Sequence, residues 1–186
     1  DSQRARVSDD ILVVGNDLDH KDASRTIELL AATFPFRRVV SLGPRLSETP
    51  YLQVYQSGSL SERDVNRLYA EAMLVVFPSF YEGFGFPIVT DLAYGKTILA
   101  RKSELLDEIA ARCSTGRLIA FTRRDQLVEI VGRLLHGEPV EEEPLGAAVS
   151  GAARRWSDAA HDIMRFLNDV TGSPRRSNWL ERERAV

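Results

Sequence analysis

Cysteine is almost absent from this sequence: the 186-residue chain contains one, Cys113. A single cysteine cannot form a disulfide within the chain, and no Cys/His spacing typical of a structural zinc site is present. No apolar run approaches the ~20 residues that a membrane-spanning helix needs, and no signal peptide is recognisable. The sequence therefore gives no support for a disulfide-stabilised, zinc-stabilised or membrane-spanning protein.

An excess of charge of one sign is also lacking. The 24 basic and 27 acidic residues give a net charge of −3, so no nucleic-acid-binding surface is expected. Hydrophobic residues make up 44% and charged residues 27%, as in ordinary globular proteins, and the length suits one domain with a short tail. The sequence starts at Asp1 rather than Met, and residues 1–10 are polar. We expect this segment to be a disordered or truncated lead-in, cut from a longer protein or left by processing.

Short apolar runs alternate with segments of helical period. Near-continuous apolar runs are typical of a parallel sheet covered on both faces. The expected strands are Ile11–Val14, Val39–Leu42, Leu52–Tyr55, Leu74–Phe77, Thr97–Ala100 and Leu118–Phe121, and the expected helices are 22–34, 61–72, 87–94, 104–112 and 124–136. This alternation predicts an α/β fold: a Rossmann-like, doubly wound parallel sheet in three α/β/α layers. Such sheets bind ligands beyond the carboxyl ends of their strands, where the strand order reverses.

An acidic, proline-bounded break follows at residues 138–144, EPVEEEP. A last helix is expected at about 147–170, because its apolar residues share one face. Those residues are Trp156, Ile163, Phe166 and Leu167. We therefore predict a domain over residues 11–172 and a charged tail over 173–186.

The segment from Phe77 to Gly95, FPSFYEGFGFPIVTDLAYG, carries the clearest functional pattern. A buried strand enters a loop with Gly83 and Gly85, and a helix opens at Pro87, whose fixed φ suits the first helical position. Glycines let the backbone approach a ligand, and the free amides of a helix start favour an anion. A phosphate pocket is expected here, with the Glu82 carboxylate at its mouth as an acceptor for neighbouring sugar hydroxyls.

The same residues resemble a known family. FPSFYEGFGFP is similar to the PS-x-x-EGFG-x-P signature of the large retaining glycosyltransferase family of the family 4, or group 1, type, whose members have the two-domain GT-B fold. Other motifs of the family are also matched, in the same order along the chain, by residues 11–22, 57–72, 93–100 and 105–109 and by Trp156. The resemblance spans roughly residues 11–170. It implies the nucleotide-sugar-binding half of a GT-B enzyme, with transfer requiring an N-terminal domain that the sequence lacks.

The resemblance also implies roles for individual residues. Lys21 and Glu82 are the expected catalytic residues: Lys21 contacts the donor diphosphate and Glu82 approaches the transferred sugar. The expected donor-binding residues are Gly15, Asn16, Lys21, Gly58, Glu82, Gly83, Phe84, Gly85 and Thr90. Lys21 makes a metal ion unnecessary, so we expect neither a metal nor another cofactor. The implied partners are a nucleotide sugar and a saccharide or lipid-linked acceptor, and the implied location is the cytoplasm or the inner face of its membrane.

The sequence departs from the family pattern at two site positions. Asn16 stands where Arg is usual and brings no charge. Thr90 stands where a second Glu usually holds the ribose, and Asp91 lies about 100° further around the helix. Asp91 is expected either to reach the ribose or to favour the helix dipole. Phe84 and Phe86 are interpreted as packing residues, and His20 as a residue that orders its loop.

Three alternatives to a nucleotide-sugar glycosyltransferase remain at this point. The first is a catalytically silent member kept for binding or assembly, which the Thr90 replacement favours. The second is a nucleotide-sugar epimerase or a related two-domain protein, which the EGFG signature disfavours. The third is a response-regulator-like domain, which would require acidic residues where Gly15 and Asn16 follow the first strand.

Overall fold

The computed structural model describes residues 8–112, 115–141, 160–166 and 169. The chain divides into two compact units, Asp1–Val149 and Ser150–Val186. Among the described residues, the first contains the sheet and five α-helices, and the second contains the helical residues 160–166 and 169.

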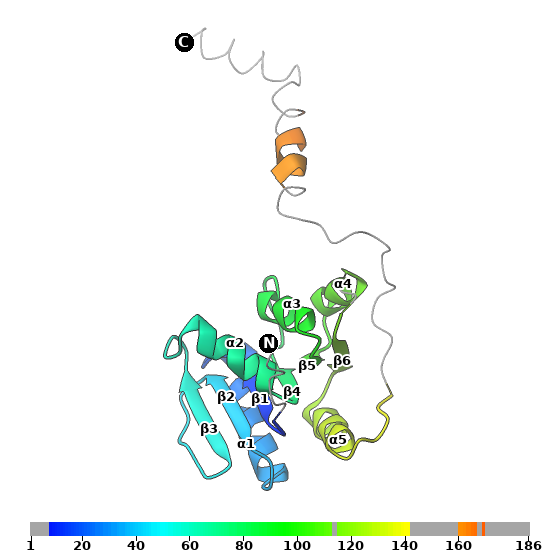
Figure 1. Cartoon of the computed structure of the whole chain (residues 1–186). Coiled ribbons are helices and arrows are strands. Elements are labelled where there is room, and N and C mark those ends of the chain that lie inside the picture. Colours follow the sequence, from blue (N-terminus) through cyan, green and yellow to red (C-terminus); the bar gives the residue numbers. More distant parts are fainter. Residues whose placement is uncertain (1–7, 113–114, 142–159, 167–168, 170–186) are drawn as a thin grey trace, which may run out of the picture. The chain divides into compact units, whose positions relative to one another are not determined.

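The first unit is built on a six-stranded sheet with the order β3-β2-β1-β4-β5-β6, in which every pairing is parallel (Figure 1). The strands are β1 (Ile11–Val14), β2 (Val39–Gly43), β3 (Leu52–Gln56), β4 (Leu74–Phe77), β5 (Thr97–Arg101) and β6 (Arg117–Phe121). Each predicted strand is confirmed to within one residue. The order reverses between β1 and β4, which are neighbours, so the ligand-binding edge is expected where these two strands end.

Helices cover both faces of the sheet, as the doubly wound prediction requires. One face carries α1 (Ala23–Thr33) and α5 (Arg124–Leu135), and the other carries α2 (Glu62–Glu71), α3 (Phe86–Ala93) and α4 (Glu104–Arg112). A short 3₁₀ turn, η1 (Asp19–Lys21), precedes α1.

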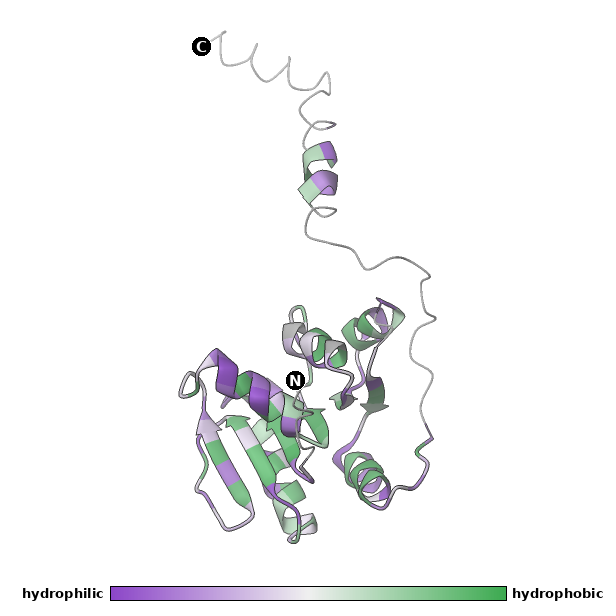
Figure 2. Ribbon diagram, in the orientation of Figure 1, coloured by the Kyte–Doolittle hydropathy of each residue, from purple (hydrophilic) through white to green (hydrophobic). Residues whose placement is uncertain are grey.

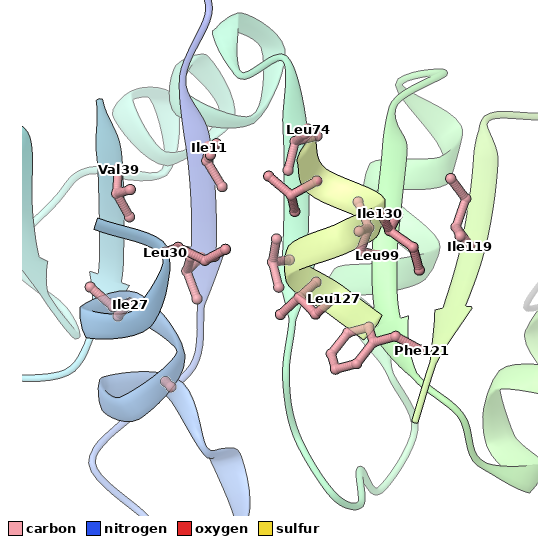
Figure 3. Close-up of a cluster of buried hydrophobic side chains, with 14 of the residues drawn as sticks. Ile11, Ile27, Leu30, Val39, Leu74, Leu99, Ile119, Phe121, Leu127 and Ile130 are labelled. Atoms are coloured by element: carbon pink, nitrogen blue, oxygen red, sulfur yellow. The ribbon is translucent and has the colours of Figure 1, made fainter. Parts of the chain in front are cut away.

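Successive strand residues alternate between the two faces and bury two separate cores. Figure 3 shows the first core, where Ile27 and Leu30 of α1 lie on the side of Ile11 and Val39, and Leu127 of α5 lies on the side of Leu99 and Phe121. Leu12, the next residue of β1, belongs to the second core, with α2, α3 and α4. Each buried large aliphatic side chain stabilises the fold by about 1.5–3 kcal/mol.

The connection between β2 and β3 contains no helix. Residues 44–51 cross back beside the sheet, with an isolated bridge between Thr49 and Leu52 and with Leu46 packed against the first core. The next helix, α2, is capped by Ser61, whose side chain accepts a 3.2 Å hydrogen bond from the backbone N–H of Asp64. Figure 2 shows that α2 carries many hydrophilic residues.

The predicted last helix is described only in part. Residues 160–166 and 169 are helical, whereas Trp156 and Leu167 lie outside the described residues. Ile163 is 59% and Phe166 is 65% exposed. No helix in the described part of the chain is both long and apolar enough to cross a membrane.

Candidate functional site

Two loops meet at the carboxyl ends of β1 and β4: residues 15–22, between β1 and α1, and residues 78–85, between β4 and α3. The backbone N–H of Phe80 donates a 2.7 Å hydrogen bond to the carbonyl of His20. The rings of His20 and Tyr81 stack at 4.2 Å and 11°. The loops converge as predicted, and the contacts of His20 fit the loop-ordering role.

Lys21 and Glu82, the two expected catalytic residues, contact each other directly. Lys21 Nζ lies 2.7 Å from Glu82 Oε2, and the two side chains are 19% and 22% exposed. The pair places a cation suited to a phosphate beside a carboxylate that can accept from hydroxyls. Both are partly buried, so their charges are screened less than those of an exposed pair.

The start of α3 borders this pair. Gly85 is its N-cap, with φ of 70°, and, having no side chain, it leaves the amides at the helix start without a side-chain cap of its own. A Cβ at Gly85 would lie 2.8 Å from Ile109 Cδ1, so the left-handed conformation and the packing both favour glycine. A Cβ at Gly83 would meet nothing within 4 Å. A ligand can therefore approach the loop at Gly83, and an uncapped helix start favours an anion there.

Close backbone packing shapes the loop after β1. A Cβ at Gly15 would lie 2.6 Å from the Ala23 Cβ, so glycine lets α1 approach β1. A Cβ at Gly43, the last residue of β2, would lie 1.5 Å from the Gly15 carbonyl oxygen. Gly43 was not predicted from the sequence as a residue that shapes this loop. Asn16 Oδ1 accepts a 3.1 Å hydrogen bond from the N–H of Leu18 and so holds the loop's own backbone.

Asp91 has neither of the two roles expected from the sequence. It is fully buried, so it cannot reach a ribose, and it is the sixth residue of α3 rather than part of its first turn. Neither carboxylate oxygen has a hydrogen-bond partner among the residues that the structure describes. Burial raises the pKa of Asp91 to about 8, against the opposing effect of the Lys96 charge. Thr90 lies on the exposed side of the same helix.

Two other predicted site residues differ from expectation or lie apart. Phe84 is 60% exposed, so its interpretation as a packing residue is wrong: the loop turns its ring outward. Gly58 follows β3, which is separated from β4 by β2 and β1, roughly 14 Å across the sheet.

A charge network around the buried Asp22, the residue after Lys21, was not predicted from the sequence. The Asp22 carboxylate accepts from Arg101 Nη2 at 2.7 Å and from Arg124, whose Nε lies 3.0 Å away. These residues are 79 and 102 positions from Asp22 in sequence, so no local pattern could indicate their contact.

A small cavity of about 10 Å³ lies between Glu82 and α4. Ser79, Tyr81 and Glu82 contribute to its lining, and within the described part of the chain the buried Ser79 hydroxyl has no hydrogen-bond partner. Its volume is about that of one water molecule, and a buried hydroxyl on its wall favours a small polar occupant. Among the residues that the structure describes, no group of three His, Cys, Asp or Glu side chains could hold a metal ion.

Comparison with known proteins identifies the fold and the family. A mannosyltransferase of Mycolicibacterium hassiacum, "MMP alpha-(1->4)-mannosyltransferase", is 35% identical over 96 residues, covering 50% of this chain and 23% of the relative. The catalytic domain of starch synthase IV from Arabidopsis thaliana, solved with ADP and acarbose, has a TM-score of 0.62 at 13% identity, covering 92% of this chain and 40% of that structure. An Anabaena protein solved with UDP and glucose has a TM-score of 0.55 at 18% identity, covering 69% and 39%.

The chain thus spans less than two thirds of each of these proteins. The structural likenesses confirm the Rossmann-like α/β fold expected for one half of a GT-B enzyme. The family model "Glycosyl transferases group 1" matches residues 8–156, which favours the glycosyltransferase interpretation over the epimerase and response-regulator alternatives. The chain belongs to the family of group 1 glycosyl transferases.

Proposed function

We propose that this chain binds the diphosphate and sugar of a nucleotide sugar where β1 and β4 end. The observation that carries the proposal is the Lys21–Glu82 contact of 2.7 Å at the start of α3. In the bound state Lys21 and the α3 amides hold the diphosphate, which acquires charge as it leaves. Glu82 then accepts from the hydroxyls of the sugar.

The proposed reaction is transfer of the sugar to a saccharide or lipid-linked acceptor with retention at the anomeric carbon. The bond from that carbon to the diphosphate oxygen breaks, and a bond to the acceptor oxygen forms on the same face. The leaving diphosphate keeps the electron pair and takes the acceptor proton. In this proposal Lys21 supplies the positive charge at the diphosphate without a metal ion.

The acceptor is proposed to bind through a second domain, because the GT-B active site lies in the cleft between two domains. The 186-residue chain alone is then expected to bind nucleotides and to transfer no sugar. A cytoplasmic location, at the inner membrane face for a lipid-linked acceptor, belongs to the same proposal.

The test is calorimetry of this chain with UDP, GDP and ADP, with the corresponding nucleosides, and with their sugar conjugates. Lys21→Ala is expected to weaken diphosphate binding by roughly 1–3 kcal/mol, the range for a charge-assisted hydrogen bond, and to leave nucleoside binding unchanged. Lys102→Ala is the matched control, because Lys102 is exposed and follows β5 at the same sheet edge. Equal diphosphate binding by Lys21→Ala and the parent would contradict the role of Lys21.

A second candidate is a catalytically silent module, and Thr90 is the observation that favours it. A neutral hydroxyl at this position binds a ribose diol less strongly than a carboxylate, since hydrogen bonds to ions are about twice as strong. The buried Asp91 cannot compensate. If the parent binds no nucleotide at millimolar concentration, the silent module replaces the enzyme as the better proposal.

A further inference from the structure

Arg101, the last residue of β5, contacts both loops of the candidate site. Its Nε donates to the carbonyl of Pro78 at 2.9 Å, and its Nη2 donates to Asp22 Oδ2 at 2.7 Å. Its Nη1 donates to the carbonyl of Thr122 at 2.7 Å. The guanidinium carbon also lies 4.1 Å from the centre of the Phe80 ring. The side chain is only 8% exposed, so these partners replace water around its charge.

The residues that Arg101 contacts in the two loops lie close in sequence to Lys21 and Glu82. Asp22 directly follows Lys21, and Pro78 and Phe80 precede Glu82 in the same loop. Asp22 also has a left-handed φ of 50°, which joins η1 to α1. The guanidinium therefore fixes the residue after Lys21 and the backbone that leads to Glu82.

The free energy of this buried ion pair favours a role in fixing the geometry of the loops over a role in stabilising the fold. The Asp22 carboxylate is 2% exposed, and a buried ion pair costs about as much in lost hydration as it gains in attraction. Apolar side chains could fill the same space at lower cost. Arg presents donors in a planar fork, which can address a carboxylate and a carbonyl at fixed angles, whereas a lysine ammonium cannot.

We propose that Arg101 is a positioning residue of the donor site: through Asp22 and Pro78 it sets the separation of Lys21 and Glu82. The effect that Arg101 is expected to have on nucleotide binding rests on the proposed function. Its structural part concerns the two loops alone and can be tested without a ligand.

The ligand-free test uses the stacking of His20 on Tyr81, since those residues directly precede Lys21 and Glu82. Ring stacking shifts the carbon-bound ring protons of His20 in the NMR spectrum, and His20→Gln identifies the signal. In Arg101→Lys we expect this shift to be largely lost in spectra recorded well below the unfolding temperature. In Arg124→Lys we expect it to remain, because Arg124 bonds Asp22 without bonding the Pro78 carbonyl. An unchanged signal in Arg101→Lys, or equal loss in both variants, overturns the proposal.

The ligand-binding test compares nucleoside diphosphate with nucleoside. Arg101→Lys is expected to weaken diphosphate binding about tenfold, the equivalent of one charge-assisted hydrogen bond, and to leave nucleoside binding unchanged. Equal weakening of both ligands indicates a general structural role and overturns the proposal. If the parent binds no nucleotide, the proposed function fails, but the NMR comparison still decides the positioning role.

Arg101→Lys could prevent folding, and a second variant then keeps the test decisive. Asp22→Asn removes the charge that Arg101 meets but leaves its bond to the Pro78 carbonyl. The His20 signal is expected to move in this variant. An unmoved signal means that Asp22 does not transmit the position of Arg101, which overturns the proposal.

Discussion

Lys21 and Glu82 are each other's partner, so a diphosphate has to replace Glu82 at the Lys21 ammonium. Glu82→Gln removes that competing charge. We expect bare nucleoside diphosphates to bind this variant about tenfold more tightly, since roughly 1–2 kcal/mol of ion pairing is no longer lost. Nucleotide sugars are expected to gain less, because their hydroxyls lose a charged acceptor.

Calorimetry with matched diphosphates and sugar conjugates measures this difference. Glu108→Gln is a suitable control, because Glu108 pairs with Arg112 on the exposed side of α4. Weaker binding of the bare diphosphate to Glu82→Gln would show that Glu82 orients Lys21 rather than competing for it.

Asp91 gives a prediction about pH. The folded protein keeps this carboxyl protonated up to about pH 8, whereas an unfolded chain releases the proton near pH 4. Between these values the folded state binds more protons, so this group's contribution to stability falls as pH rises. Asp91→Asn cannot ionise. It is expected to remove that fall and to raise the free energy of unfolding at pH 7 by roughly 1–3 kcal/mol.

Urea unfolding at several pH values between 4 and 9 checks this expectation. Glu129→Gln, on the exposed side of α5, is expected to keep the parental pH dependence. The same dependence in Asp91→Asn and the parent would mean that Asp91 is ionised in the folded protein.

At the scale of elements, the end of β2 is held against the start of the loop after β1. Gly43→Ala places a Cβ 1.5 Å from the Gly15 carbonyl oxygen at a φ of 131°. The backbone has to move and adopt a strained conformation, so we expect a loss of about 3 kcal/mol or more in the free energy of unfolding. Gly137→Ala has a φ of 70° but meets nothing within 4 Å, and it is expected to lose only about 1 kcal/mol. Denaturant midpoints give both values, and equal losses would contradict the steric explanation.

Most elements of the first unit could be predicted from the sequence because each strand is a short apolar run between helical segments. β4, Leu74–Phe77, is buried throughout and is apolar throughout. The convergence of the loops that carry Lys21 and Glu82 could also be predicted, since a doubly wound parallel sheet binds ligands beyond the carboxyl ends of its strands, where their order reverses. The burial of Asp91 could not, because a carboxylate on a helix normally indicates an exposed face. The network of Asp22, Arg101 and Arg124 also escaped prediction, since it joins three distant segments.

At the scale of the whole first unit, the strands that carry the site are the central ones. β1 pairs with β2 and β4, and β4 pairs with β1 and β5, whereas β3 and β6 are the edges of the sheet. The β2–β3 connection has no helix, so β3, unlike the other strands after β1, is not preceded by a helix in the sequence.

This strand order predicts which strands of the first unit lose their hydrogen bonds by local unfolding and which only by global unfolding. Backbone amides of β1 and β4, such as those of Leu12 and Val75, are expected to exchange with deuterium only through global unfolding, because both strands are bonded on two sides. Amides of β3 are expected to exchange faster, through local opening of the edge, and native-state hydrogen exchange measures the difference. Equal protection of β3 and β1 would contradict this order. Mild denaturant should then release the edge strand first, while the loops of Lys21 and Glu82 stay anchored until the last cooperative step.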